Sequence, residues 1–156
     1  MKILLFLLLP FSLFAHSSKA VVVIKSEHQL YLLSDGDIEG KFHIALGANP
    51  QGHKHQEGDE RTPEGSYLLD YQNPKSSYYK SIHITYPNSD DVSYASAQGV
   101  NAGGMIMIHG QRNYFGWLWP ITQKFDWSDG CIALSNDEMD KVWDFWEKDI
   151  PIYIVW

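Results

Sequence analysis

Short apolar segments that read as β-strands recur along the chain and limit its fold more than any other feature. They are VVVIKSEHQLYLL (21–33), IEGKFHIALG (38–47), in which Phe42, Ile44 and Leu46 alternate on one face, SYLLDY (66–71), KSIHITY (80–86), GGMIMIHG (103–110) and PIYIVW (151–156). SDGD at 34–37 is a hairpin signal, so the first strands are expected to be antiparallel. The sequence therefore predicts a mostly β fold.

One α-helix is clearly indicated, in the C-terminal region. Ser135 precedes NDEMDKVWDFWEKD (136–149), and Glu138 follows three residues later, which is a capping box. Apolar residues recur at helical spacing, so this helix is expected to pack against the core. They are Met139, Val142, Trp143 and Trp146.

The N-terminal segment, residues 1–20, has the charged, apolar and small-residue order of a secretory signal peptide. Its apolar run is shorter than the roughly 20 residues of a membrane-spanning helix. Cleavage after Ala15 or after Ala20 fits equally, and residues 21–156 have the length of one ordinary domain. An uncut membrane anchor is the alternative. The prediction is export to the periplasm or cell envelope, with no stable membrane insertion after cleavage.

Charge narrows the choice of partners. The chain has 12 basic and 19 acidic residues, a formal net charge of −7. Such a surface argues against nucleic acid as a partner, because phosphate binding needs positive charge. The sequence does not predict an oligomeric state.

Cys131 is the one cysteine of the chain. In an exported protein an unpaired cysteine indicates an intermolecular bond or a reactive thiol, and the alternative is a buried, inert side chain. A nucleophilic cysteine needs a base, and His109, at the end of an apolar strand, is the best candidate. The amides around Gly130 and Cys131 are candidates to hold an oxyanion in acyl transfer.

Metal binding is weakly indicated. His53 and His55 form HKH in a long segment without periodicity, but no further ligand motif accompanies them. No metal site and no cofactor are therefore predicted.

IMIHG (106–110) followed by SDGCIAL (128–134) resembles the signature of the L,D-transpeptidase catalytic domain of the YkuD type, in the subgroup with a DW[ST]DGCIA segment. RTPEGSY (61–67) resembles another segment of that family, and the resemblance covers about residues 20–156. It implies a mostly β, sandwich-like fold. It also implies L,D-transpeptidation of peptidoglycan stem peptides through a cysteine thioester, in cell-wall cross-linking or remodelling and hence cell shape.

The resemblance also assigns roles to residues. It makes Cys131 the nucleophile and His109 the general base, oriented by the carbonyl of Gly110. Ser128, Asp129 and Gly130 would shape the oxyanion loop.

Two departures from the family pattern concern substrate contacts. Ala133 stands where many members carry Arg or Asn. The segment before Ser128 contains an aromatic insertion, 113–127, that is expected to be either a lid or a surface loop. Its candidate substrate-binding residues are Trp117, Trp119 and Trp127.

Two arginines, Arg61 and Arg112, are candidates to bind stem-peptide carboxylates, the alternative being solvated surface residues.

Two rival functions remain. An L,D-carboxypeptidase or peptidase would hydrolyse the same acyl-enzyme, and a non-catalytic wall-binding module would use the aromatic residues alone.

Overall fold

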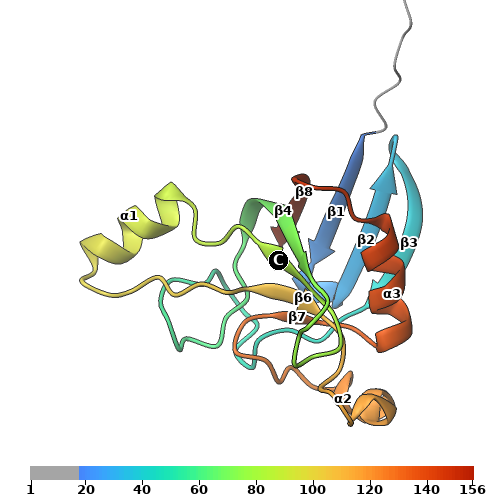
Figure 1. Ribbon diagram of the computed structural model, residues 1–156. Helices are drawn as coiled ribbons and strands as arrows, with labels where there is room; N and C mark the ends of the chain where they lie inside the picture. Colours follow the sequence, from blue (N-terminus) through green and yellow to red (C-terminus); the bar gives the residue numbers. More distant parts are fainter. Residues whose placement is uncertain (1–17) are drawn as a thin grey trace, which may run out of the picture.

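The structure, a computed structural model, describes residues 18–156, so the expected signal peptide lies almost wholly outside the described residues. One curled eight-stranded sheet dominates the fold, with strand order β3-β2-β1-β8-β4-β5-β6-β7 (Figure 1). The strands are β1 (Lys19–Ile24), β2 (Gln29–Ser34), β3 (Asp37–His43), β4 (Gly65–Asn73), β5 (Ser81–Ile84), β6 (Met107–His109), β7 (Ile132–Ala133) and β8 (Ile150–Val155). The mostly β prediction is confirmed.

The first three strands form an antiparallel meander, as the hairpin signal predicted. Asp35 and Gly36 both have positive φ, 52° and 90°, which a two-residue turn matched to the twist of the strands requires. β8 pairs in parallel with β1 and antiparallel with β4. The C-terminal strand thus joins the meander to the half of the sheet that carries β6 and β7.

Helix α3 (Asn136–Phe145) begins at the predicted capping box, in which Ser135 Oγ accepts from Glu138 N and the Glu138 side chain accepts from Ser135 N. Met139 and Val142 are buried, and Lys141 extends over the Phe42 ring of β3. Figure 1 shows α3 beside β2 and β3.

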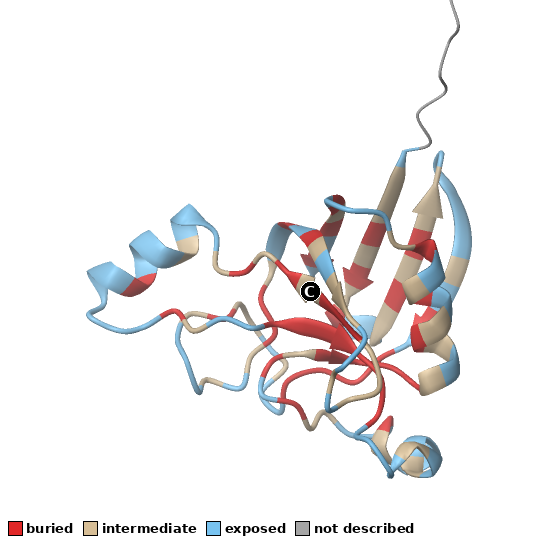
Figure 2. Ribbon diagram, in the orientation of Figure 1, coloured by how far each residue is buried: buried red, intermediate tan, exposed pale blue. Residues whose placement is uncertain are grey.

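Helix α1 (Ser89–Ala97) was not predicted from the sequence. Asn88 caps it by accepting from the backbone amides of Asp90 and Asp91, while Asp91 accepts from Asn88 N. Ala95 is its one buried residue, so no apolar stripe marks the helix in the sequence. α1 projects from the sheet and is largely exposed (Figure 2).

The core lies between the curled sheet and α3, and its fully buried side chains come from nearly every strand. They include Val21, Leu30, Leu69, Ile82, Ile108, Ile132, Met139 and Ile152. The remaining short elements are η1 (Lys25–Glu27), η2 (Gly116–Leu118) and α2 (Trp119–Thr122). Within residues 18–156, no helix has the length and apolar character needed to cross a membrane.

Candidate active site

Two neighbouring strands bring His109 and Cys131 together. β6 and β7 are parallel, with Ile108 opposite Ile132 and His109 opposite Ala133. Side chains two residues apart in a strand share a face of the sheet, so Cys131, just before β7, is placed on the face of His109. The thiol and the imidazole line the same cavity, which has a volume of about 260 Å³. Its other lining residues are Ser76, Tyr78, Ser81, Met105, Met107, Trp127, Ser128 and Asp129.

His109 is buried, with 4% of its surface exposed. Its Nδ1 lies 2.7 Å from the carbonyl oxygen of Gly110, so Nδ1–H donates there and Nε2 is left as the basic nitrogen. Burial lowers the pKa of His109, although the bond to Gly110 opposes this shift. At neutral pH the imidazole is therefore uncharged.

Cys131 Sγ lies 3.7 Å from the carbonyl oxygen of Met105, which accepts the thiol proton. Burial raises the pKa of the Cys131 thiol, and the negative charge of Asp129 adds to the rise, against a smaller lowering by the backbone of Met107. The resting site therefore holds a neutral thiol beside a neutral imidazole. Such a site stores no thiolate in its resting state.

We expect iodoacetamide to alkylate Cys131 slowly at pH 7, with a rate that rises with pH to about 9 and beyond. The thiolate fraction is small below the raised pKa of the thiol, and the lowered pKa of His109 leaves no imidazolium to stabilise it. The measurement is the alkylation rate of the folded protein from pH 5 to 10. A rate that is already high at pH 6 and constant up to pH 8 would indicate a thiolate–imidazolium pair and contradict this expectation.

The loop before Cys131 is closed by Ser128, whose hydroxyl donates to the carbonyl oxygen of Cys131 at 2.6 Å. The same hydroxyl accepts from the amide of Gly130 at 3.1 Å, so this amide already has a partner. Gly130 has φ +124°, and a Cβ added there would lie 2.6 Å from the carbonyl oxygen of Arg61. Gly130 thus lets the loop pack closely against the segment 48–64, which contains Arg61.

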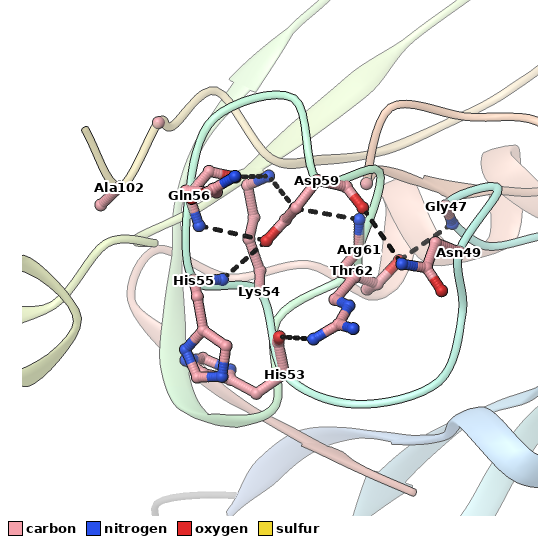
Figure 3. Close-up of polar contacts among 12 residues, drawn as sticks. Gly47, Asn49, His53, Lys54, His55, Gln56, Asp59, Arg61, Thr62 and Ala102 are labelled. Atoms are coloured by element: carbon pink, nitrogen blue, oxygen red, sulfur yellow. Dashed lines mark hydrogen bonds and ion pairs between the residues drawn. The ribbon is translucent and has the colours of Figure 1, made fainter. Parts of the chain in front are cut away.

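An internal ion pair holds the segment 48–64 in shape (Figure 3). Lys54, 3% exposed, donates from Nζ to Asp59 Oδ1 at 2.8 Å. The Asp59 carboxylate also accepts from the backbone amides of His55, Gln56 and Arg61. Burial by itself would raise the pKa of Asp59, but Lys54 and these amides lower it to about 2.

Asp59→Asn is expected to lower the free energy of unfolding by about 3 kcal/mol at pH 7, because it leaves the buried Lys54 ammonium without its carboxylate. The carboxylate's contribution is present above about pH 4 and is lost as the pH falls towards 2, since the folded pKa lies below the unfolded one. Urea unfolding at pH 7 measures the loss. Glu60→Gln, at an exposed neighbour, is the matched control and should stay within about 0.5 kcal/mol of the parent protein. Equal stability of the two variants would contradict the role of the ion pair.

The predicted substrate-binding residues occupy different places. Trp127 lines the cavity of His109 and Cys131, and Arg112 lines a second cavity beside it. The Arg61 guanidinium lies 3.5 Å from the carbonyl oxygen of His53 and lines neither cavity (Figure 3). Trp117 and Trp119 are 73% and 48% exposed and also line neither. The structure thus brings two of the five to the cavities.

The aromatic insertion is fixed at its C-terminal end. Thr122 Oγ1 donates to Gln111 Oε1 at 2.6 Å, and Gln111 Nε2 donates to the carbonyl oxygen of Leu134. Gln123 Nε2 donates to the carbonyl oxygen of Ala133 at 3.1 Å. Ala133 is fully buried, pairs with Ala45 and His109, and lines neither cavity.

Tyr78 is a cavity residue that the sequence did not reveal. Its ring centroid lies 4.7 Å from that of His109, and the Trp127 ring lies 5.7 Å from His109 on an edge-to-face approach. Tyr78 sits in an irregular segment before β5, with no motif to mark it. The two aromatic rings hold the imidazole in a largely apolar setting, which accounts for the lowered pKa of His109.

His53 and His55 are used within their own segment. His53 Nδ1 accepts from Glu64 N at 2.9 Å and Nε2 lies 3.0 Å from Asp91 Oδ1, while the His55 ring packs on Tyr94. Across residues 18–156, no group of three or more metal-binding side chains is present.

Comparison with known proteins gives the class to which this fold and site belong. The YkuD family model, the L,D-transpeptidase catalytic domain, matches residues 18–154. The match covers nearly all of the described residues, and the chain belongs to this family. The resemblance inferred from the motifs is thereby confirmed.

Two curated relatives are classed by name with the L,D-transpeptidases. YafK of Escherichia coli (strain K12) is 33% identical over 96 residues, which are 60% of this chain and 31% of YafK. YqjB of Bacillus subtilis (strain 168) is 28% identical over 123 residues, 76% of this chain and 61% of YqjB. The chain thus spans less than two thirds of either relative.

Solved structures agree with the fold. The helical cell shape determining protein Pgp2 of Campylobacter jejuni matches with a TM-score of 0.66 and 28% identity, over 88% of this chain and 47% of Pgp2. An L,D-transpeptidase of Mycobacterium smegmatis matches with a TM-score of 0.61 and 16% identity, over 90% of this chain and 59% of that chain. The second match supports the fold alone.

Proposed function

We propose that the protein is an exported cysteine acyltransferase that acts on peptidoglycan stem peptides. One observation carries the proposal: Cys131 and an uncharged His109, with Nε2 available, line one cavity in a member of the L,D-transpeptidase family. The role fits cell-wall cross-linking or remodelling and, by likeness to Pgp2, an effect on cell shape.

The proposed reaction begins when the thiol turns from Met105 to His109. Nε2 takes the thiol proton while Sγ attacks the carbonyl carbon of the donor peptide. The tetrahedral intermediate collapses with loss of the amine, which receives that proton from His109, and a thioester forms on Cys131. An acceptor amine then gives a proton to Nε2 and attacks the thioester carbon. The C–S bond breaks, and the leaving sulfur takes that proton from Nε2 to restore the thiol.

The oxyanion of the intermediate needs hydrogen-bond donors near Cys131. The amide of Gly130 donates to Ser128 Oγ in the resting site, so we assign the main donor role to the amide of Cys131 itself. Ser128 then acts by shaping the loop that carries this amide, and Asp129 lines the mouth of the cavity.

Transfer and hydrolysis differ in whether an amine or water reaches the thioester. We favour transfer, because it is the activity that names the family. Tyr78 and Trp127 support this choice, since their rings pack against His109 and would limit the access of water from that side.

Mass spectrometry of muropeptides tests the proposal. The mature protein is incubated with a donor tetrapeptide, with and without an amine acceptor of the diaminopimelate type. Cross-linked or exchanged product is expected with the acceptor. Shortened peptide alone, even at high acceptor concentration, would make the protein a hydrolase, and no product in either case would refute the catalytic proposal.

For export, we propose cleavage after Ala15 in preference to Ala20. Ser18 and Lys19 take part in the fold. Asp35 N donates to the carbonyl oxygen of Ser18, Ser18 N donates to the Asp35 carboxylate, and Lys19 Nζ lies 2.7 Å from Glu147 Oε1. Cleavage after Ala20 would remove these contacts and the first two residues of β1. N-terminal sequencing of the exported protein identifies the cleavage site.

A further inference from the structure

A second cavity adjoins the catalytic one. Its volume is about 320 Å³, and its lining residues are Tyr78, Gln111, Arg112, Phe115, Thr122 and Trp127. We call it the side pocket. Tyr78 and Trp127 line both cavities, so their rings form a shared wall within reach of His109. A molecule bound at Cys131 can therefore extend around this wall.

Arg112 is an exposed residue that brings a positive charge to the side pocket. Within residues 18–156 its guanidinium forms no ion pair or hydrogen bond, although four lysines of this acidic chain are paired with carboxylates. The backbone around it is fixed, because Phe115 N donates to the carbonyl oxygen of Arg112 and Gln111 N donates to Asn136 Oδ1. A free guanidinium on a fixed backbone is suited to binding a carboxylate in a two-bond fork.

The shared wall also holds a buried donor that lacks an acceptor among the described residues. Trp127 Nε1 is buried and has no hydrogen-bond acceptor in the described part of the chain. A buried N–H without an acceptor is costly, so its position beside two cavities points to a ligand with acceptor oxygens.

We propose that the side pocket binds the amino acid whose nitrogen leaves or attacks, and that Arg112 binds the carboxylate on the carbon next to that nitrogen. This inference rests on the proposed function. In a tetrapeptide donor the amine that leaves belongs to the C-terminal residue, whose carboxylate is one carbon away. A diaminopimelate-type acceptor carries a carboxylate at the same distance from its attacking amine.

One pocket can serve both half-reactions. In acylation the C–N bond to this amino acid breaks, and its nitrogen takes the proton held by His109. In deacylation an amine in the same pocket forms the new C–N bond and gives its proton to His109. The apolar walls of Phe115 and Trp127 contact the side chain of the amino acid, while Arg112 sets the direction of its nitrogen.

The test compares two donors that differ at one group: a tetrapeptide with a free C-terminal carboxylate and the same peptide with a C-terminal carboxamide. The parent protein should favour the carboxylate donor by about tenfold in kcat/KM, as expected for loss of a charge-assisted bond. Arg112→Ala should lower kcat/KM for the carboxylate donor by about tenfold and leave the carboxamide donor within about twofold. Arg112→Lys should retain part of the preference.

Lys124→Ala is the matched control, because Lys124 is an exposed cation of the aromatic insertion that does not line the side pocket. It should change neither donor. An Arg112→Ala variant that loses activity equally with both donors, or that keeps the carboxylate preference, would overturn the inference. A parent protein that turns over neither donor would instead overturn the proposed function, and the role of the pocket with it.

Discussion

Replacement of Cys131 by alanine is expected to lower kcat/KM for a donor tetrapeptide by about 10⁴-fold or more. Without Sγ no thioester can form, and removal of a covalent nucleophile typically costs this much. His109 cannot compensate by activating water to the same degree, because the acyl-enzyme route divides the reaction into two easier steps. Steady-state assay of purified protein measures the loss.

The Cys131→Ala variant is expected to fold normally, because the thiol contacts the backbone of Met105 and Met107 only weakly. Its melting temperature should therefore match that of the parent protein within a few degrees. Residual activity above about 10% of the parent value, in a folded variant, would place the nucleophile elsewhere.

Gly130→Ala is expected to have the second largest effect, lowering the free energy of unfolding by at least about 2 kcal/mol and kcat/KM by about 10²-fold. The new Cβ would meet the Arg61 carbonyl oxygen at 2.6 Å, at a φ of +124° that L side chains rarely adopt. Relief of this contact moves the loop, and the Cys131 amide and thiol move with it. Urea unfolding and the peptide assay measure the two effects.

Gly58→Ala is the matched control. Gly58 also has positive φ, +78°, but a Cβ there meets nothing within 4 Å. The Gly58→Ala variant should therefore show only the cost of backbone strain. We expect its free energy of unfolding to fall by about 1 kcal/mol and its activity to stay unchanged. If Gly130→Ala resembled this control in both measurements, the close contact with Arg61 would not be what holds the loop.

The strands and α3 could be predicted because burial of one face leaves a period in the sequence. The Asp35–Gly36 turn and the Ser135 capping box added local signals that the structure confirms. α1 lacks an apolar face, and its cap at Asn88 was its only signal. β7 has two residues, too few for any period to appear.

The site was predictable only where a motif marked it. Cys131 and His109 stand in such motifs, and strand register brings them to one cavity. Tyr78 lies in a turn, and its place beside His109 depends on how segments distant in sequence pack. The sequence likewise could not tell that Arg61 turns to the His53 carbonyl while Arg112 reaches a cavity.

The most direct test of Cys131 as the nucleophile is to trap the acyl-enzyme. The mature protein is mixed with a donor tetrapeptide, quenched in acid within seconds, digested and analysed by mass spectrometry. We predict that the acyl group of the donor, less its C-terminal residue, is found on the peptide that contains Cys131, and that hydroxylamine removes it as expected of a thioester. An adduct on another residue, or turnover of the donor with the Cys131 peptide unmodified at every quench time, would contradict a reaction through a thioester on Cys131.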